Sequence, residues 1–109
     1  MSSWLLLAVA IAAEIVGTLA LRASDGFSRP LPSVLVVVGY AISFTLLAQL
    51  LKTMSVGVVY AVWSAVGIAA IAVLGRVLFD DPLPPLAMLG ITVIILGVGL
   101  VQLSGAGPR

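Results

Sequence analysis

Residues 4–21 read Trp4-Leu-Leu-Leu-Ala-Val-Ala-Ile-Ala-Ala-Glu14-Ile-Val-Gly-Thr-Leu-Ala-Leu21, an apolar run with one carboxylate and no basic residue. As a helix rising about 1.5 Å per residue, this run is roughly 27 Å long, close to the hydrocarbon thickness of a bilayer. Glu14 falls within about one turn of its middle. Because an acid at that depth is costly and usually marks an ion or substrate path, we interpret Glu14 as the functional centre of the chain.

The composition of the whole chain is that of an integral membrane protein. Of its 109 residues, 62% are hydrophobic and 8% are charged, far from the usage of soluble domains. The absence of cysteine and histidine removes the commonest thiolate and imidazole ligands of metal sites, so we expect no metal. The formal net charge is +1, with no basic patch for nucleic acid. No nucleophile and base pair or phosphate loop is evident, so we expect neither an enzyme nor a bound cofactor.

Three further apolar runs follow the first, so the chain is predicted to be an all-α membrane protein with a single four-helix domain over residues 1–109. The predicted helices cover residues 4–21, 33–51, 58–74 and 86–103. Asp25-Gly26 is a turn signal, and Pro30 and Pro32 lack amide donors, so residues 22–32 are predicted to form a loop. Gly75-Arg76 is predicted to end the third helix.

Candidate binding residues share helical faces. Small residues surround Glu14 on the first helix, which predicts a groove beside the acid. A lipophilic cation would gain about 0.5 to 2 kcal/mol from each well-placed ring, and a charge partner in the acid. Interfacial anchoring is the alternative for Tyr60 and, more weakly, for Trp63. The three faces consist of Ala10, Gly17 and Thr18 on the first helix, Tyr40, Ser43, Phe44 and Leu47 on the second, and Tyr60, Trp63, Ser64 and Gly67 on the third.

Oligomerisation is expected because four helices leave little room for both a packed core and a water-filled cavity. The fourth run carries Gly90 and Gly97 seven residues apart on one face, with Gly99 nearby. Small residues of this kind allow membrane helices to approach closely, which makes a dimer contact plausible. Glycines that merely pack within one subunit are the alternative, because such residues are common in membrane helices.

The charges that decide membrane orientation are nearly balanced. Lys52 and Arg109 would lie on one side of the membrane, and Arg22, Arg29 and Arg76 on the other. The positive-inside rule requires an imbalance, so this pattern predicts insertion in both orientations. The alternative is that the slight bias suffices for one orientation.

Segments from three of the predicted helices carry a family resemblance: Ala13-Glu14-Ile-Val-Gly17-Thr18, Gly39-Tyr40 and Tyr60-Ala-Val-Trp63-Ser64-Ala-Val-Gly67. Over nearly its whole length, the chain resembles the small multidrug resistance family and, within it, the EmrE-like quaternary ammonium and multidrug exporters. The resemblance implies an antiparallel, dual-topology homodimer in the bacterial inner membrane. Such dimers exchange protons for toxic lipophilic cations by alternating access.

The resemblance also implies roles for individual residues. Glu14 would be the shared proton and drug site, and Tyr60 and Trp63 would line the pocket. Tyr40, Ala10, Thr18, Ser43, Phe44 and Leu47 would lie around it.

Two residues bear on which branch of the family this chain resembles and on how it assembles. Ile15 follows Glu14 where guanidinium exporters usually have Trp, which favours the branch that exports polyaromatic cations. Ala65 stands where multidrug members usually have the first glycine of a flexible Ser-Gly-Val-Gly kink, so a heterodimer remains an alternative. Two further alternatives stay open, namely export of guanidinium or a polyamine, and a non-transporting membrane subunit whose Glu14 pairs with a basic residue of a partner.

Overall fold

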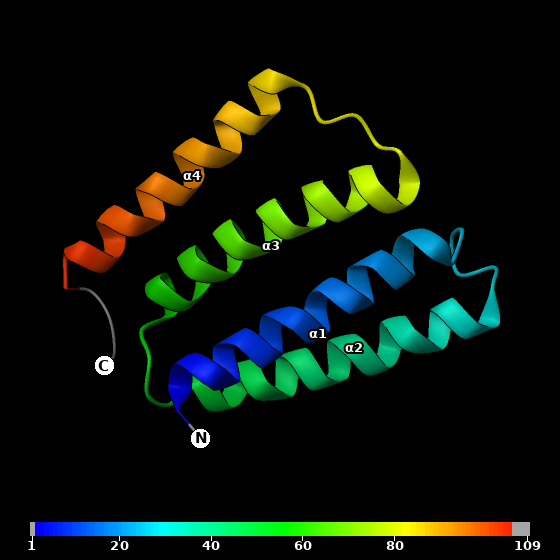
Figure 1. Ribbon diagram of the computed structural model, residues 1–109. Coiled ribbons are helices and arrows are strands. Elements are labelled where there is room, and N and C mark those ends of the chain that lie inside the picture. The colour runs from blue at the N-terminus through cyan, green and yellow to red at the C-terminus, as the bar shows by residue number, and fades with distance from the viewer. Residues whose placement is uncertain (1, 106–109) are drawn as a thin grey trace. The chain divides into compact units, whose positions relative to one another are not determined.

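The computed structural model describes residues 2–105, which form four α-helices and no strand (Figure 1). These are α1 (Ser3–Ala23), α2 (Pro30–Leu50), α3 (Val56–Phe79) and α4 (Pro85–Leu103). Each described helix is long and apolar enough to cross a membrane, which confirms the prediction of an all-α fold with four spans. Arg109, which entered the charge balance above, lies outside the described residues.

Two helix ends differ from the prediction by three residues or more. α2 begins at Pro30 instead of Ser33, because a proline in the first turn gives up an N–H group that has no partner within the helix in any case. α3 runs through Gly75 and Arg76 to Phe79 instead of ending at residue 74. It stops at Asp80, whose left-handed backbone (φ 57°) lets the N–H of Asp81 reach the carbonyl of Gly75 at 3.2 Å.

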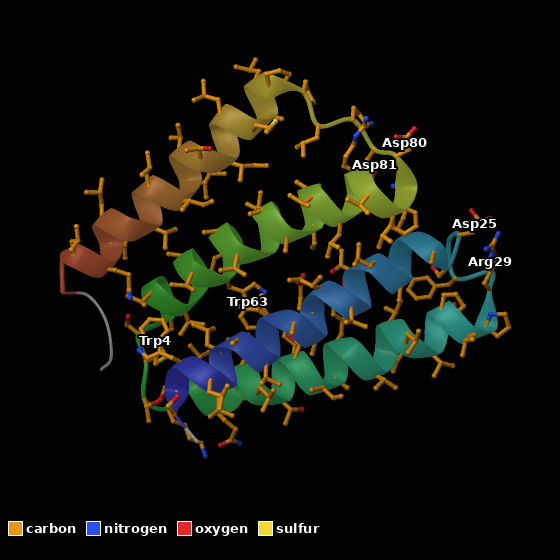
Figure 2. The ribbon with its side chains drawn as sticks, in the orientation of Figure 1. Trp4, Asp25, Arg29, Trp63, Asp80 and Asp81 are labelled. Atoms are coloured by element: carbon orange, nitrogen blue, oxygen red, sulfur yellow. The ribbon has the colours of Figure 1, made fainter. Side chains whose placement is uncertain are left out.

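The described chain divides into two compact units at the link between Lys52 and Thr53. In the first unit, α1 and α2 lie side by side and antiparallel (Figure 1), and their connecting loop carries Asp25 and Arg29 (Figure 2). Three consecutive loop residues have positive φ values, namely Asp25 (49°), Gly26 (72°) and Phe27 (66°).

Ser24 holds this left-handed turn in place. Its buried hydroxyl donates to the carbonyl of Leu21 at 2.7 Å and accepts the N–H of Phe27 at 3.0 Å. Its backbone carbonyl accepts the N–H groups of Ser28 and Arg29 at 2.9 and 3.1 Å. One serine therefore closes the end of α1 and fixes the start of the loop, as expected for a residue that competes for local backbone groups.

Two glycines allow α1 and α2 to approach closely near Glu14. A Cβ atom on Gly39 would lie 2.9 Å from the carbonyl oxygen of Ala13 and 3.0 Å from the Cα of Gly17. A Cβ atom on Gly17 would lie 3.1 Å from the ring of Tyr40. The contact between the helices is thus made by backbone against backbone at Gly39 and by an aromatic ring against backbone at Gly17.

Gly39→Ala is therefore expected to destabilise the protein by about 1 to 3 kcal/mol, because the added methyl group meets the α1 backbone and cannot be accommodated by a side-chain rotation. Gly57→Ala is the matched control, since no described atom outside the adjacent backbone lies within 4 Å of its Cβ position and alanine favours a helix by up to about 1 kcal/mol. Thermal unfolding of both variants in detergent measures the difference. Equal stability of the two variants would contradict the close contact at Gly39.

The second unit consists of α3 and α4. Ala65 and Gly67 are buried on α3, whereas no residue of α4 is buried by the described part of the chain. Apart from the adjacent backbone of α4 itself, no described atom lies within 4 Å of the Cβ positions of Gly90 and Gly97. Within this unit, α3 therefore leaves most of the apolar surface of α4 open to lipid or to other protein surfaces.

Candidate binding site around Glu14

Glu14 lies in the middle of α1 and is half-buried. Its Oε1 accepts a hydrogen bond from the hydroxyl of Thr18, one helical turn further on, at 3.1 Å. Its Oε2 is buried and has no hydrogen-bond partner among the described residues. The two oxygens of one carboxylate thus have different surroundings, and an unpaired buried oxygen is a strong acceptor for a proton or a cation.

Tyr40 on α2 extends this arrangement across the helix pair. Its hydroxyl oxygen lies 2.8 Å from Oγ1 of Thr18, so three side chains form a chain of hydrogen bonds that ends at Glu14. Thr18 and Tyr40 are both half-buried. The structure therefore brings together three of the predicted site residues, from two helices.

A second polar contact joins the helices on the other side of Glu14. The hydroxyl of Ser43 donates to the backbone carbonyl of Ala10 at 2.9 Å, and both residues are fully buried. Ala10 lies one turn before Glu14, and Thr18 lies one turn after it. α2 therefore contacts α1 through a hydroxyl on each side of the acid, with the Gly39 contact between them, and Ala10 and Ser43 belong to this helix contact.

Phe44 and Leu47, the remaining predicted residues of α2, follow Tyr40 along the helix. The rings of Tyr40 and Phe44 are 6.1 Å apart and tilted by 39°, within the usual range for interacting aromatic pairs. Phe44 is 58% exposed, while Leu47 in the next turn is half-buried. An exposed aromatic ring thus lies one turn from Tyr40 on the helix that packs against Glu14.

The predicted face of α3 lies in the other unit and is described by itself. Tyr60 is 74% exposed, and Trp63 and Ser64 are half-buried. Trp63 lies within the helix, away from its ends (Figure 2), and its Cδ1 is 4.0 Å from the Cβ position of Gly67. One edge of the indole ring therefore lies beside a glycine. No group of acids that could hold a metal ion occurs among the described residues.

Four spanning helices and a half-buried acid that accepts a hydrogen bond from a threonine hydroxyl define a small multi-pass membrane protein with an ionisable group inside its first span. The chain belongs to the Small Multidrug Resistance protein family, whose model matches residues 2–94. This match confirms the resemblance that the sequence motifs indicated.

Individual relatives agree with this assignment. The chain is 48% identical over 103 residues to "Multidrug transporter PA4990" of Pseudomonas aeruginosa, with 94% of each chain covered. It is 40% identical over 103 residues to "Quaternary ammonium compound-resistance protein QacF" of Klebsiella aerogenes, again with 94% of each covered. It is 41% identical over 102 residues to "Multidrug resistance protein EbrB" of Bacillus licheniformis, with 94% of this chain and 86% of the relative covered.

The sequence reasoning missed the role of Gly39, which lets α2 approach the backbone of α1 beside the acid. It also missed the link from Tyr40 through Thr18 to Glu14. A partial signal was present, because Thr18 follows Glu14 by four residues and so shares its face. No comparable signal gives the register of α2 against α1.

Proposed function

We propose that this protein is a proton-coupled antiporter that exports lipophilic and quaternary ammonium cations, and that it is not an enzyme. The observation that carries the proposal is Glu14, a single acid in the middle of a spanning helix, with one oxygen held by Thr18 and the other buried and unpaired. The names of the relatives, which describe multidrug transport and quaternary ammonium resistance, support the same activity. Its place would be the bacterial inner membrane.

One carboxylate can couple two fluxes because it binds either a proton or a cation, but not both at once. A cation that arrives displaces the proton, and a proton that arrives displaces the cation. With alternating access, each exchange moves the two ligands in opposite directions. A gradient of one pH unit supplies about 1.36 kcal/mol per proton, and a potential of 100 mV supplies about 2.3 kcal/mol per net charge moved.

Aromatic side chains are proposed to select the cation. Tyr60 and Phe44 expose their rings, and Trp63 and Tyr40 are half-buried, so each has surface with which to contact a ligand. Rings of this kind attract cations through their faces and bind apolar substituents through burial. Guanidinium or a polyamine remains the second candidate for the substrate, although the aromatic and apolar residues favour a lipophilic cation. Leu47 and Ser64 complete the proposed pocket, with Ala10 and Ser43 supporting it from within the helix pair.

The working unit is proposed to be an antiparallel homodimer with two copies of Glu14. The open Cβ positions of Gly90 and Gly97 and the absence of buried residues on α4 in the described chain support a contact between two copies of α4. Gly67 on α3 is proposed to permit the conformational change. Ala65 beside it keeps a heterodimer as the alternative assembly, because alanine makes this stretch of helix stiffer than glycine would.

The test is equilibrium binding of tetraphenylphosphonium to the purified protein across a range of pH. We expect binding that weakens as the pH falls, because protons then occupy Glu14. Trp63→Ala is expected to lower the affinity by about tenfold, since a desolvated ring contributes up to about 2 kcal/mol to the binding of a cation.

Trp4→Ala is the matched control. Like Trp63, Trp4 is a partly exposed tryptophan, but it lies near the start of α1 (Figure 2). It is expected to bind tetraphenylphosphonium with unchanged affinity. Equal affinities in folded Trp63→Ala and wild-type protein would remove Trp63 from the pocket. Failure of the wild type to bind at any pH would favour a non-transporting subunit.

A further inference from the structure

We infer that Thr18 is a positioning residue that reserves Oε2 of Glu14 for the proton or the cation, and that Tyr40 sets the direction in which the Thr18 hydroxyl points. The inference rests on the proposed function, because it takes Glu14 to be the shared binding site. It goes further by giving the two oxygens of the carboxylate different tasks.

Each hydroxyl has one proton, and this fixes the direction of the hydrogen bonds that run from Tyr40 through Thr18 to Glu14. Oγ1 of Thr18 lies 3.1 Å from Oε1 of Glu14 and 2.8 Å from the hydroxyl oxygen of Tyr40. A threonine hydroxyl has one proton to donate and accepts through its lone pairs. When that proton points to Glu14, the close contact with Tyr40 requires the phenol to donate. A phenol is the stronger donor of the two hydroxyls, so Tyr40 favours this direction.

This hydrogen bond makes the two carboxylate oxygens of Glu14 different. Oε1 is occupied by Thr18, whereas Oε2 is buried and has no partner among the described residues. An arriving proton or cation therefore meets its acceptor at Oε2, and Thr18 continues to donate to Oε1. In general, a hydrogen bond donated to a carboxylate oxygen favours the ionised form over the protonated acid.

No other charged side chain of the α1 and α2 pair competes with this arrangement. Tyr40 is the one titratable group that the described part of α2 places next to Glu14, and α2 carries no charged residue. Arg22 lies two turns beyond Glu14, in the last turn of α1. Within this helix pair, the hydroxyl chain is thus the polar side-chain contact that reaches Glu14.

The experiment measures how the affinity for tetraphenylphosphonium depends on pH in hydroxyl variants of the purified full-length protein. Thr18→Val keeps the shape of the side chain but removes the hydroxyl. We expect the pH at which half of the sites bind the cation to rise by about one unit, which corresponds to tenfold tighter proton binding or about 1.36 kcal/mol. The affinity at high pH, where no proton competes, is measured separately, so that a change in cation contacts is distinguished from a change in the midpoint.

Two further variants separate positioning from packing. Thr18→Ser keeps the hydroxyl and is expected to restore the wild-type midpoint. Tyr40→Phe is expected to raise the midpoint by less than Thr18→Val, and to add no shift when combined with it, because Tyr40 acts through Thr18. If Thr18→Val does not fold, the shift in Tyr40→Phe alone decides the inference.

The outcomes distinguish this inference from the proposed function. An unchanged midpoint in folded Thr18→Val, together with loss of binding in Glu14→Gln, would overturn the role of Thr18 and leave Glu14 as the binding site. A Thr18→Ser variant that behaves like Thr18→Val would also overturn it, because packing and not the hydroxyl would then matter. Binding that survives Glu14→Gln with its pH dependence intact would overturn the proposed function itself.

Discussion

Glu14→Gln is expected to reduce proton-driven uptake of a lipophilic cation in proteoliposomes to the background rate, and to remove resistance in a growth assay. A neutral amide can neither release a proton nor balance the charge of a cation, so both halves of the exchange fail together. The variant is expected to fold, because an amide oxygen can still accept the hydrogen bond that Thr18 donates to Oε1. Loss of activity therefore reports chemistry and not unfolding.

Glu14→Asp is the companion variant, since it keeps the acid and shortens the side chain by one methylene group. In the wild-type protein, Oγ1 of Thr18 lies 3.1 Å from Oε1 of Glu14. The shorter aspartate side chain withdraws the acid from this contact. We expect cation binding to persist with an altered pH profile. Coupled uptake that persists in Glu14→Gln would show that another group carries the proton, and the assignment of Glu14 would be wrong.

The fold was predictable because membrane spans follow from composition and length alone. An uninterrupted apolar run long enough to cross a bilayer satisfies its backbone only as a helix, so four such runs predicted four helices. The helix ends were harder to predict from the sequence. Pro30 begins α2 where it was expected to precede the helix, and Gly75 lies inside α3 where it was expected to end it. A proline can precede a helix or occupy its first turn, and a glycine can end a helix or lie within it. The sequence alone therefore does not decide between these positions.

The candidate site was predictable where it depends on one helix and not where it depends on two. Thr18 shares a face with Glu14 because four residues make about one turn, and the structure places its hydroxyl on the acid. The contacts from Tyr40 to Thr18 and from Ser43 to Ala10 depend on how far α2 slides along α1. That register follows from the close contact of Gly39 with Ala13 and Gly17, a property of two surfaces that neither sequence segment contains alone.

A single added lysine is expected to fix the membrane orientation and to remove resistance, because the antiparallel dimer proposed above needs both orientations of one chain. On the predicted topology, Arg22, Arg29 and Arg76 would lie on one side and Lys52 and Arg109 on the other, a difference of one. Thr53→Lys is expected to hold the loop after α2 in the cytoplasm and the N-terminus with it, whereas Ser28→Lys is expected to place the N-terminus outside.

Each lysine variant expressed alone is therefore expected to confer little or no resistance, and co-expression of the two is expected to restore it. The opposed pair rebuilds a dimer with two copies of Glu14. Thr53→Gln and Ser28→Gln are the matched controls, because they lengthen the same side chains without adding charge and are expected to leave both orientation and resistance unchanged. A reporter fused to the C-terminus, active on one side of the membrane, measures orientation beside the growth assay. A wild-type chain that inserts in one orientation only, yet confers full resistance by itself, would exclude the antiparallel homodimer and favour a parallel or heteromeric assembly.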